Sequence, residues 1–259
     1  MSDTNNKPHA IFAQRETPPD FRVLIATPLQ AGQMWCETAH ALLSVALRDG
    51  EVPGLQFEWE QMGGLGIAGA RNELAWLMYQ KKCNAILFWD SDVVPIGDPV
   101  KPVLGLVRHG RDLVGGMYRH KTEDRKTWVA NFLPGEQPDA NGLLKVEDCG
   151  AGFLFATRFL LDTIIIKGLA APYTRGFATP KPPGTVMHDF FSMGVIADPL
   201  HGNEPSYKTE DFMLAHKARA AGFACYVDTQ VRLDHMGIHK FRANVEGMPA
   251  PWLQDAKKV

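Results

Sequence analysis

Short apolar runs and segments of helical periodicity alternate through the first half of the chain, and this alternation restricts the fold more than any other feature. The predicted strands are residues 23–26, 55–60, 85–89 and 113–117, and the predicted helices between them are residues 34–48, 68–82 and 99–108. Strands that alternate with helices at such intervals are typical of a mostly parallel sheet covered on both faces by helices. The sequence therefore predicts the α/β class.

The second half of the chain is less regular. Residues 128–132 and 143–146 predict a small antiparallel excursion from the main sheet. Further strands are predicted at residues 152–156 and 224–227, and further helices at residues 159–167 and 209–221. The many prolines and glycines between residues 170 and 206 predict a long mobile loop.

Composition and charge exclude several classes of protein. The chain has 259 residues, of which 45% are hydrophobic and 22% are charged, so it has the composition of a globular protein and not of a disordered chain or a coiled coil. A net charge of −2 gives no bulk positive field for nucleic acid or acidic lipid. The longest run without a charged residue, 23–36, has 14 residues, whereas a membrane-spanning helix needs about 20. No transmembrane anchor is therefore expected.

The N-terminal segment and the cysteines bear on where the protein resides. Residues 1–20 are polar and contain prolines, which predicts a flexible arm without the apolar core of a signal peptide. The four cysteines are far apart and form no CxxC pair, so we expect reduced thiols and a cytoplasmic location.

The segment Gly64–Gly69 reads as a GxGxxG motif. It follows a predicted strand, opens a predicted helix, and precedes Asp90 by 21 residues, which is the spacing of a dinucleotide-binding fingerprint. Glu58 and Glu60 weaken this interpretation, because a central parallel strand should be continuously apolar. An NAD-dependent oxidoreductase and a plain glycine-rich loop both stay open as interpretations of this segment.

A second motif, Asp90-Ser91-Asp92, directly follows the predicted strand at residues 85–89. Ligands of open α/β sheets bind beyond the carboxyl ends of the strands, so these carboxylates lie where a ligand is expected. Their oxygens suit Mg²⁺ or Mn²⁺ that bridges a diphosphate. A solvated turn is the alternative interpretation of the same three residues.

Several short motifs surround these carboxylates in a recognisable order. They are Ala70-Arg71-Asn72, Gly150-Ala151-Gly152, Thr209-Glu210-Asp211, Val227-Asp228 and Asp234-His235-Met236-Gly237. Together with Asp90-Ser91-Asp92, this order resembles the GT-A glycosyltransferases, most of all the compact bacterial and phage-type members related to family 2. The resemblance implies a Rossmann-like GT-A fold in one domain at residues 21–241. It further implies a nucleotide-binding half at about 21–118, an acceptor half at about 119–241, and a tail at 242–259.

The resemblance assigns residues to the sugar nucleotide. Thr27 and Pro28, at the end of the first predicted strand, would hold the base and ribose. Arg71 and Asn72 would face the nucleotide of the sugar donor, and Lys240 would neutralise the departing diphosphate.

The same resemblance implies a metal site. Asp92 would be a direct ligand of Mn²⁺ or Mg²⁺, and His235 would complete the site. Asp90 would contact the ribose or a metal-bound water, with Ser91 beside it.

The resemblance also assigns the acceptor side. Gly150, Ala151 and Gly152 would form a small-residue turn beneath the donor sugar and the acceptor, because only small side chains let backbone approach a sugar closely. Asp211 would be the general base for the acceptor hydroxyl, and Glu210 would orient the site. Three further residues, Tyr118, Arg119 and Lys121, lie on the ligand side of the predicted sheet without an assigned role.

The function expected from the resemblance is metal-dependent transfer of a sugar from a nucleotide diphosphate, with UDP favoured, to a hydroxyl acceptor with inversion. The acceptor class stays open among glycan, protein, small molecule and modified DNA base. The chain has no Gln-x-x-Arg-Trp, which favours transfer of single sugars over polymerisation. The alternatives are a sugar nucleotidyltransferase, the NAD-dependent oxidoreductase, and a non-enzymatic nucleotide- or glycan-binding module. The nucleotidyltransferase is disfavoured because no glycine-rich phosphate loop follows the first strand.

Overall fold

The computed structural model describes residues 20–30, 32–64, 66–122, 127–174, 181–182, 184–237 and the backbone of 240–241. The predicted arm, apart from residue 20, and the predicted tail at 242–259 lie outside the described residues.

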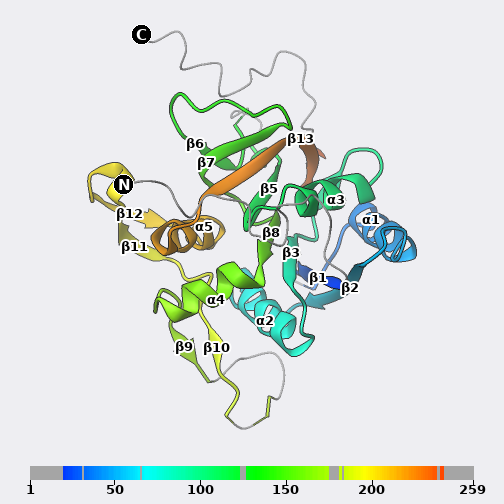
Figure 1. Ribbon diagram of the computed structural model, residues 1–259, viewed down its shortest axis with the longest axis horizontal. Helices are drawn as coiled ribbons and strands as arrows, with labels where there is room; N and C mark the ends of the chain where they lie inside the picture. Colours follow the sequence, from blue (N-terminus) through cyan, green and yellow to red (C-terminus); the bar gives the residue numbers. More distant parts are fainter. Residues whose placement is uncertain are drawn as a thin grey trace.

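A central ten-stranded sheet organises the chain (Figure 1). Eight of its strands lie side by side in the order β2 (Leu55–Met62), β1 (Phe21–Pro28), β3 (Ala85–Trp89), β8 (Phe153–Thr157), β5 (Leu113–Met117), β13 (Cys225–Met236), β7 (Leu143–Cys149) and β6 (Ala130–Phe132). Two short strands, β4 (Val93–Pro95) and β14 (Lys240–Phe241), pair with β13. Strands β2, β1, β3, β5 and β13 run in one direction, and β8 and β7 run against them. The predicted α/β class, with a sheet mostly parallel at its core, is confirmed.

Helices cover both faces of this sheet. The described chain has five α-helices, α1 (Cys36–Leu47), α2 (Ile67–Gln80), α3 (Val100–Arg108), α4 (Arg158–Ile166) and α5 (Glu210–Ala221), and one short 3-10 helix, η1 (Pro199–His201). Helices α2, α4 and α5 contribute to one hydrophobic core, and α1 and α3 contribute to the other. Because side chains alternate along a strand, β3 supplies both cores, with Ile86 and Phe88 in the first and Leu87 and Trp89 in the second.

The antiparallel excursion predicted for the second half is also present. Strands β6 and β7 pair antiparallel and extend the sheet beyond β13. Among the described residues, no helix is both long and apolar enough to cross a membrane.

The segment predicted as a long loop holds more order than its composition indicated. It forms two small antiparallel pairs, β9 (Pro172–Tyr173) with β10 (Met187–His188), and β11 (Gly194–Ala197) with β12 (Pro205–Lys208). Phe190 and Phe191 from the same segment are fully buried in the first core. Buried aromatic side chains therefore fix a stretch whose prolines and glycines suggested mobility.

The last predicted strand is much longer than the apolar run at 224–227. Strand β13 extends to Met236, with a shift of register between Asp228 and Arg232. Polar residues interrupt the apolar pattern beyond Val227, which is why the sequence hid this half of the strand. The extension pairs with β4, directly after Asp92, and it carries His235.

Candidate functional site

The carboxyl ends of the central strands surround one cavity. Asp90 and Asp92 follow β3, Tyr118 follows β5, His235 lies on the extended part of β13, and Asp211 lies in the first turn of α5. All five line a cavity of about 630 Å³. This volume is within the usual range of ligand sites, and the cavity lies where open α/β sheets bind ligands.

A second hollow adjoins the first across Asp92. It has a volume of about 600 Å³, and Gln30, Asp92 and Lys121 line both spaces. Ser91 and the partly exposed Trp35 line the second hollow but not the first cavity. The acidic motif therefore stands between two adjoining spaces and offers one carboxylate to both.

His235 is held with one ring nitrogen toward Asp92. Its Nδ1 lies 2.7 Å from the backbone carbonyl oxygen of Arg119. A carbonyl only accepts hydrogen bonds, so in the neutral imidazole Nδ1 carries the proton and Nε2 keeps its lone pair. Nε2 lies 3.6 Å from Oδ1 of Asp92. Nε2 of His235 and Oδ1 of Asp92 are thus close enough to offer their lone pairs to the same electrophile.

The other carboxylate oxygen of Asp92 contacts the ammonium group of Lys121. Burial disfavours the ionised form of Asp92, but the contacts with His235 and Lys121 outweigh it and lower the pKa of this carboxyl below its ordinary value. Asp92 is therefore an anion at neutral pH, with a cation already beside it.

Arg71 joins the first carboxylate of the motif to helix α5. Its guanidinium is fully buried and donates two hydrogen bonds to Asp90, at 2.9 and 2.8 Å, and one to Asp211 at 2.7 Å. Glu210 lies 3.6 Å from the same guanidinium. Burial raises the pKa of Asp90 to about 6. The negative charges of Asp211 and Asp92 also raise this pKa, whereas the positive charge of Arg71 lowers it. Arg71 therefore holds together carboxylates that would otherwise repel one another.

Arg71→Met is expected to lower the free energy of unfolding by about 3 kcal/mol, because it leaves Asp90 and Asp211 facing each other without their shared cation. Urea denaturation measures the loss. Arg48→Met is the matched control, since Arg48 pairs with Glu51 and Asp98 at the surface and should contribute less than about 1 kcal/mol. Equal losses in the two variants would contradict the bridging role of Arg71.

Tyr118 explains the glycines at 150 and 152. The Gly152 N–H donates a 2.8 Å hydrogen bond to the Tyr118 hydroxyl. A Cβ atom would lie 2.2 Å from this oxygen at Gly150 and 2.7 Å from it at Gly152. Ala151 between them is fully buried. The small-residue turn thus lies against Tyr118, whose pKa burial raises well above its ordinary value, so that the hydroxyl keeps its proton.

Gly152→Ala is expected to destabilise the fold by about 1–3 kcal/mol, because the new methyl group collides with the Tyr118 hydroxyl and approaches Asp90 Oδ2 at 3.2 Å. Thermal denaturation reports the change. At Gly194 no described heavy atom lies within 4 Å of an added Cβ, so Gly194→Ala should stay within about 0.5 kcal/mol of wild type. A Gly152→Ala protein as stable as the control would show that the turn can move away from Tyr118.

Two of the residues assigned to the sugar nucleotide lie buried at the end of β1. Thr27 is fully buried, and its hydroxyl accepts a 3.0 Å hydrogen bond from the Trp59 indole. Pro28 is buried as well. Gln30, two residues further on, is exposed and lines both spaces.

Asn72 lies beside Arg71 in sequence but bonds elsewhere. Its amide donates to Asp189 at 2.8 Å and accepts from the backbone N–H groups of Phe190 and Phe191 at 2.9 and 3.1 Å. This side chain fastens the segment before β11 to helix α2. The remaining assigned residue, Lys240, pairs through its backbone with Met236, and its side chain lies outside the described residues.

The glycines of the GxGxxG motif follow β2, which forms the edge of the sheet. Glu58 and Glu60 of this strand pair with Lys81, at 3.1 and 2.7 Å, and Glu58 also contacts Arg22. An edge strand explains the two acidic residues. A dinucleotide fingerprint normally follows the first, central strand, so the position of β2 does not favour that interpretation.

Two residues of the site had no role assigned from the sequence. Tyr118 and Lys121 both line the main cavity, and both follow the carboxyl end of β5. Their position directly after a predicted strand was the one feature of the sequence that indicated a place in the site. It could not predict their partners, which are Gly152, 34 residues from Tyr118, and Asp92, 29 residues from Lys121.

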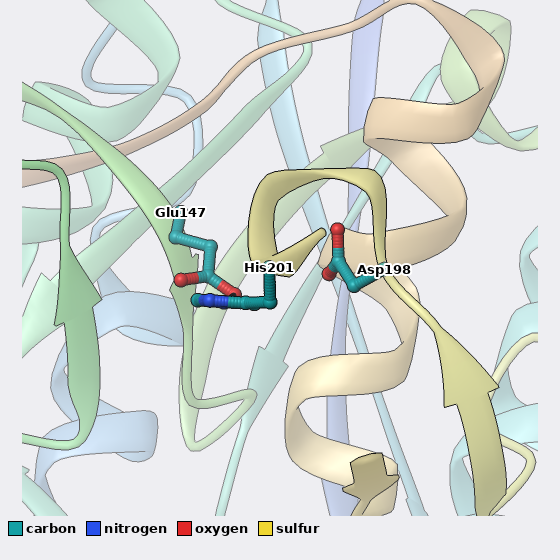
Figure 2. Close-up of side chains that lie close together, drawn as sticks. All are labelled: Glu147, Asp198 and His201. Atoms are coloured by element: carbon teal, nitrogen blue, oxygen red, sulfur yellow. Dashed lines mark hydrogen bonds and ion pairs between the residues drawn. The ribbon is translucent and has the colours of Figure 1, made fainter. Parts of the chain in front are cut away.

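A separate group of two acidic residues and a histidine lies outside the lining of the main cavity. Glu147, Asp198 and His201 place one ligand atom each within 4.8 Å of the others (Figure 2). Asp198 and His201 come from one short turn, and Glu147 comes from β7. Lys208 lies 2.9 Å from Glu147, and Arg219 lies 2.6 Å from Asp198. Protein cations therefore already balance these carboxylates.

Comparisons with known proteins yield similarities at the level of the fold. No protein-family model matches the sequence, and no curated protein gives a significant match. Among solved structures, the chain is similar to A197 from STIV, with a TM-score of 0.48, 17% identity, and coverage of 87% of this chain and 95% of that chain.

Two further solved structures are similar at lower scores. One is a glycosyltransferase involved in the glycosylation of the major capsid of PBCV-1, with a TM-score of 0.31, 12% identity, and coverage of 57% of this chain and 64% of that chain. The other is apo UDP-glucose pyrophosphorylase, with a TM-score of 0.38, 10% identity, and coverage of 81% and 73%. At such values function has to be inferred from the site itself.

Proposed function

We propose that this protein is a metal-dependent glycosyltransferase that moves a sugar from a nucleotide diphosphate, UDP being favoured, to a hydroxyl acceptor. The observation that carries the proposal is the approach of His235 Nε2 to within 3.6 Å of Asp92 Oδ1, with the tautomer set by the Arg119 carbonyl. This pair lies at the carboxyl ends of the strands and lines a ligand-sized cavity.

The chemistry of this pair fits Mn²⁺ or Mg²⁺. Two ligands at right angles on a cation, with bonds of about 2.1 Å, lie about 3 Å apart, so the observed spacing requires only a small adjustment. Imidazole nitrogen and carboxylate oxygen are both accepted by Mn²⁺. Asp92 and His235 would hold the ion, with Asp90 behind them. When bound, the cation would neutralise the developing charge of the diphosphate leaving group.

The two spaces on either side of Asp92 suit the two parts of a sugar nucleotide. Trp35, whose residue surface is 42% exposed, offers an aromatic face to a base in the second hollow. Gln30 and Ser91 supply polar groups beside it. The donor sugar would then extend past Asp92 into the main cavity, toward Asp211.

Asp211 is the proposed general base. Its side chain is 32% exposed, against 14% for Glu210 and 16% for Asp90, so it is the most accessible of the carboxylates around Arg71. Arg71 donates a hydrogen bond to Oδ1 of Asp211, so Oδ2 is left to accept the proton of an acceptor hydroxyl. Arg71 and Glu210 would fix the orientation of this base while it takes the proton.

Lys121 competes with a metal ion for Asp92, because its ammonium group contacts the same carboxylate. Lys121→Met is therefore expected to raise the affinity for Mn²⁺ by up to about fivefold, because the ion no longer competes with the free energy of a partly exposed ion pair. Isothermal titration with Mn²⁺ measures the change, and Lys101→Met on helix α3 is the control. Weaker Mn²⁺ binding in Lys121→Met would show that Lys121 supports the ion.

Thermal-shift assays separate the proposed function from its alternatives. Stabilisation by UDP that requires Mn²⁺ is expected for the transferase. Stabilisation by NAD without metal would favour the oxidoreductase and overturn the proposal, as would UDP binding that is indifferent to EDTA.

A further inference from the structure

A third hollow, of about 790 Å³, is lined by residues from the second half of the chain, between Ala130 and Phe212. Its lining residues come from β6, from Glu147 of β7, from the turn that carries His201 and Glu204, from β12, and from the first turn of α5. Phe212 lines both this hollow and the main cavity. Along the chain, Lys208 lines the hollow and Thr209 to Asp211 line the cavity, so the two spaces share Phe212, the residue that follows the proposed base.

The walls of the hollow combine aromatic rings with neutral polar groups. Phe132, Tyr207 and Phe212 are the rings, and Tyr207 is 64% exposed although it is a large aromatic residue. Ser206 contributes a hydroxyl oxygen that is buried and, within the described part of the chain, lacks a hydrogen-bond partner. Sites for small polar ligands typically join apolar or aromatic walls to a few placed polar groups. A sugar ring offers the matching surface, with C–H groups on one face and hydroxyls at its edge.

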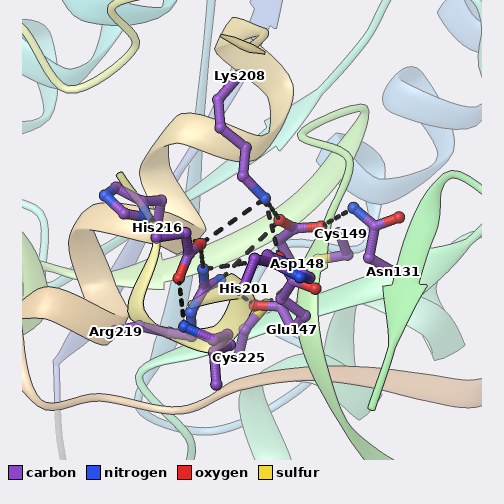
Figure 3. Close-up of polar contacts among 11 residues, drawn as sticks. Asn131, Glu147, Asp148, Cys149, His201, Lys208, His216, Arg219 and Cys225 are labelled. Atoms are coloured by element: carbon purple, nitrogen blue, oxygen red, sulfur yellow. Dashed lines mark hydrogen bonds and ion pairs between the residues drawn. The ribbon is translucent and has the colours of Figure 1, made fainter. Parts of the chain in front are cut away.

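The floor of the hollow, formed by Glu147, His201 and Lys208, belongs to a charge-compensated network of side chains (Figure 3). Lys208 donates to Glu147 at 2.9 Å and to Asp148 at 2.8 Å, and Arg219 donates to Asp198 at 2.6 Å. All five side chains are at most 17% exposed. Because Lys208 holds the Glu147 carboxylate in place, the remaining lone pairs of this carboxylate are oriented toward the hollow before any ligand binds.

The same network disfavours a polyanionic ligand. Binding to a phosphate backbone needs cations that can pair with phosphates. Lys208 and Arg219 are instead paired with three carboxylates, and His201 contacts Glu147 at 3.0 Å. The hollow thus has no positive excess to offer a nucleic acid.

We propose that this hollow binds the acceptor and that the acceptor is an uncharged saccharide, with Tyr207 stacked on its ring. The proposal rests on the glycosyltransferase function above and narrows its acceptor class. Lys208 connects the two sites along the chain, since it bonds Glu147 and Asp148 at the hollow and lies three residues before Asp211. A hydroxyl of the bound saccharide would reach Asp211 past Phe212.

Saturation-transfer NMR with the whole protein tests this assignment. The probes are the methyl glycosides of glucose, galactose, mannose, rhamnose and N-acetylglucosamine, together with maltose, cellobiose and lactose. At least one probe should receive saturation, and Tyr207→Ala should weaken its binding at least about fivefold. Phe159→Ala is the matched control, because Phe159 is an exposed aromatic residue of α4, and it should bind the probe as wild type does.

Titration of the same proteins with UDP and Mg²⁺ separates this proposal from the function on which it rests. Tyr207→Ala should bind UDP within about twofold of wild type. If wild type binds UDP with metal but none of the saccharides, or binds them equally well after Tyr207→Ala, the acceptor assignment is wrong while the transferase function stands. Transfer to an oligonucleotide that carries hydroxymethylated bases, without transfer to saccharides, would also overturn it. Failure of wild type to bind UDP would remove both proposals.

Discussion

Asp92→Asn is expected to weaken metal-supported UDP binding at least about 100-fold while the protein stays folded. The carboxylate supplies the anionic oxygen that faces His235 Nε2, and an amide oxygen is a far poorer ligand of Mn²⁺. The contact with Lys121 can survive, since an amide oxygen still accepts a hydrogen bond from an ammonium group. Isothermal titration with UDP in the presence of Mn²⁺ measures the loss.

Asp98→Asn provides the matched control for this variant. Asp98 also pairs with a cation, Arg48 at 2.8 Å, and this pair lies away from the cavity, so UDP affinity should be unchanged. Wild-type UDP affinity in Asp92→Asn, with circular dichroism showing both variants folded, would refute the metal assignment.

Asp211→Asn is expected to reduce the rate of transfer at least about 100-fold with the affinity for the sugar donor nearly intact. The amide cannot accept the proton of the attacking hydroxyl, yet it can still accept a hydrogen bond from Arg71, so the geometry of the site should persist. Single-turnover kinetics with UDP-sugar and acceptor give the rate of the transfer step, and titration with the UDP-sugar in the absence of acceptor gives the affinity for the sugar donor. Asp162→Asn on α4, where Asp162 pairs with Arg158 at 3.6 Å, is the control.

The role of Asp211 also fixes the stereochemistry. A base that deprotonates the acceptor opposite the leaving diphosphate gives a single displacement, so an α-linked UDP-sugar should yield a β-linked product. NMR of the product reads the anomeric configuration directly. An α-linked product would exclude this role for Asp211 even if the protein transfers sugars.

The parts of the fold that follow from local pattern were predictable. Strand β3 is a continuous apolar run closed by two acidic residues, so both its place in the sheet and the position of Asp90 and Asp92 followed from neighbouring residues. The same holds for α5, which ends at residue 221 as predicted and has Gly222 as its left-handed C-cap.

The contacts that turn these elements into a site were not predictable. Arg71 and Asp211 lie 140 residues apart in sequence, and no local periodicity encodes their pairing. The second half of β13 was hidden because the polar residues 228–230 separate it from the apolar run at 224–227, and it is this half that brings His235 to Asp92. The role of Asn72 depends in the same way on a segment 117 residues away.

The central claim is that Asp90-Ser91-Asp92 supports cleavage between a sugar and a nucleotide diphosphate. ³¹P NMR of the protein with UDP-, GDP- and dTDP-sugars, Mg²⁺ and the saccharide probes as hydroxyl acceptors tests it most directly, because a glycosyltransferase and a nucleotidyltransferase leave different phosphorus products. The account predicts release of the intact nucleoside diphosphate, UDP above the others, that stops with EDTA and is lost in Asp92→Asn. Formation of sugar 1-phosphate and nucleoside triphosphate on addition of pyrophosphate, without release of the diphosphate, would contradict it and identify a nucleotidyltransferase.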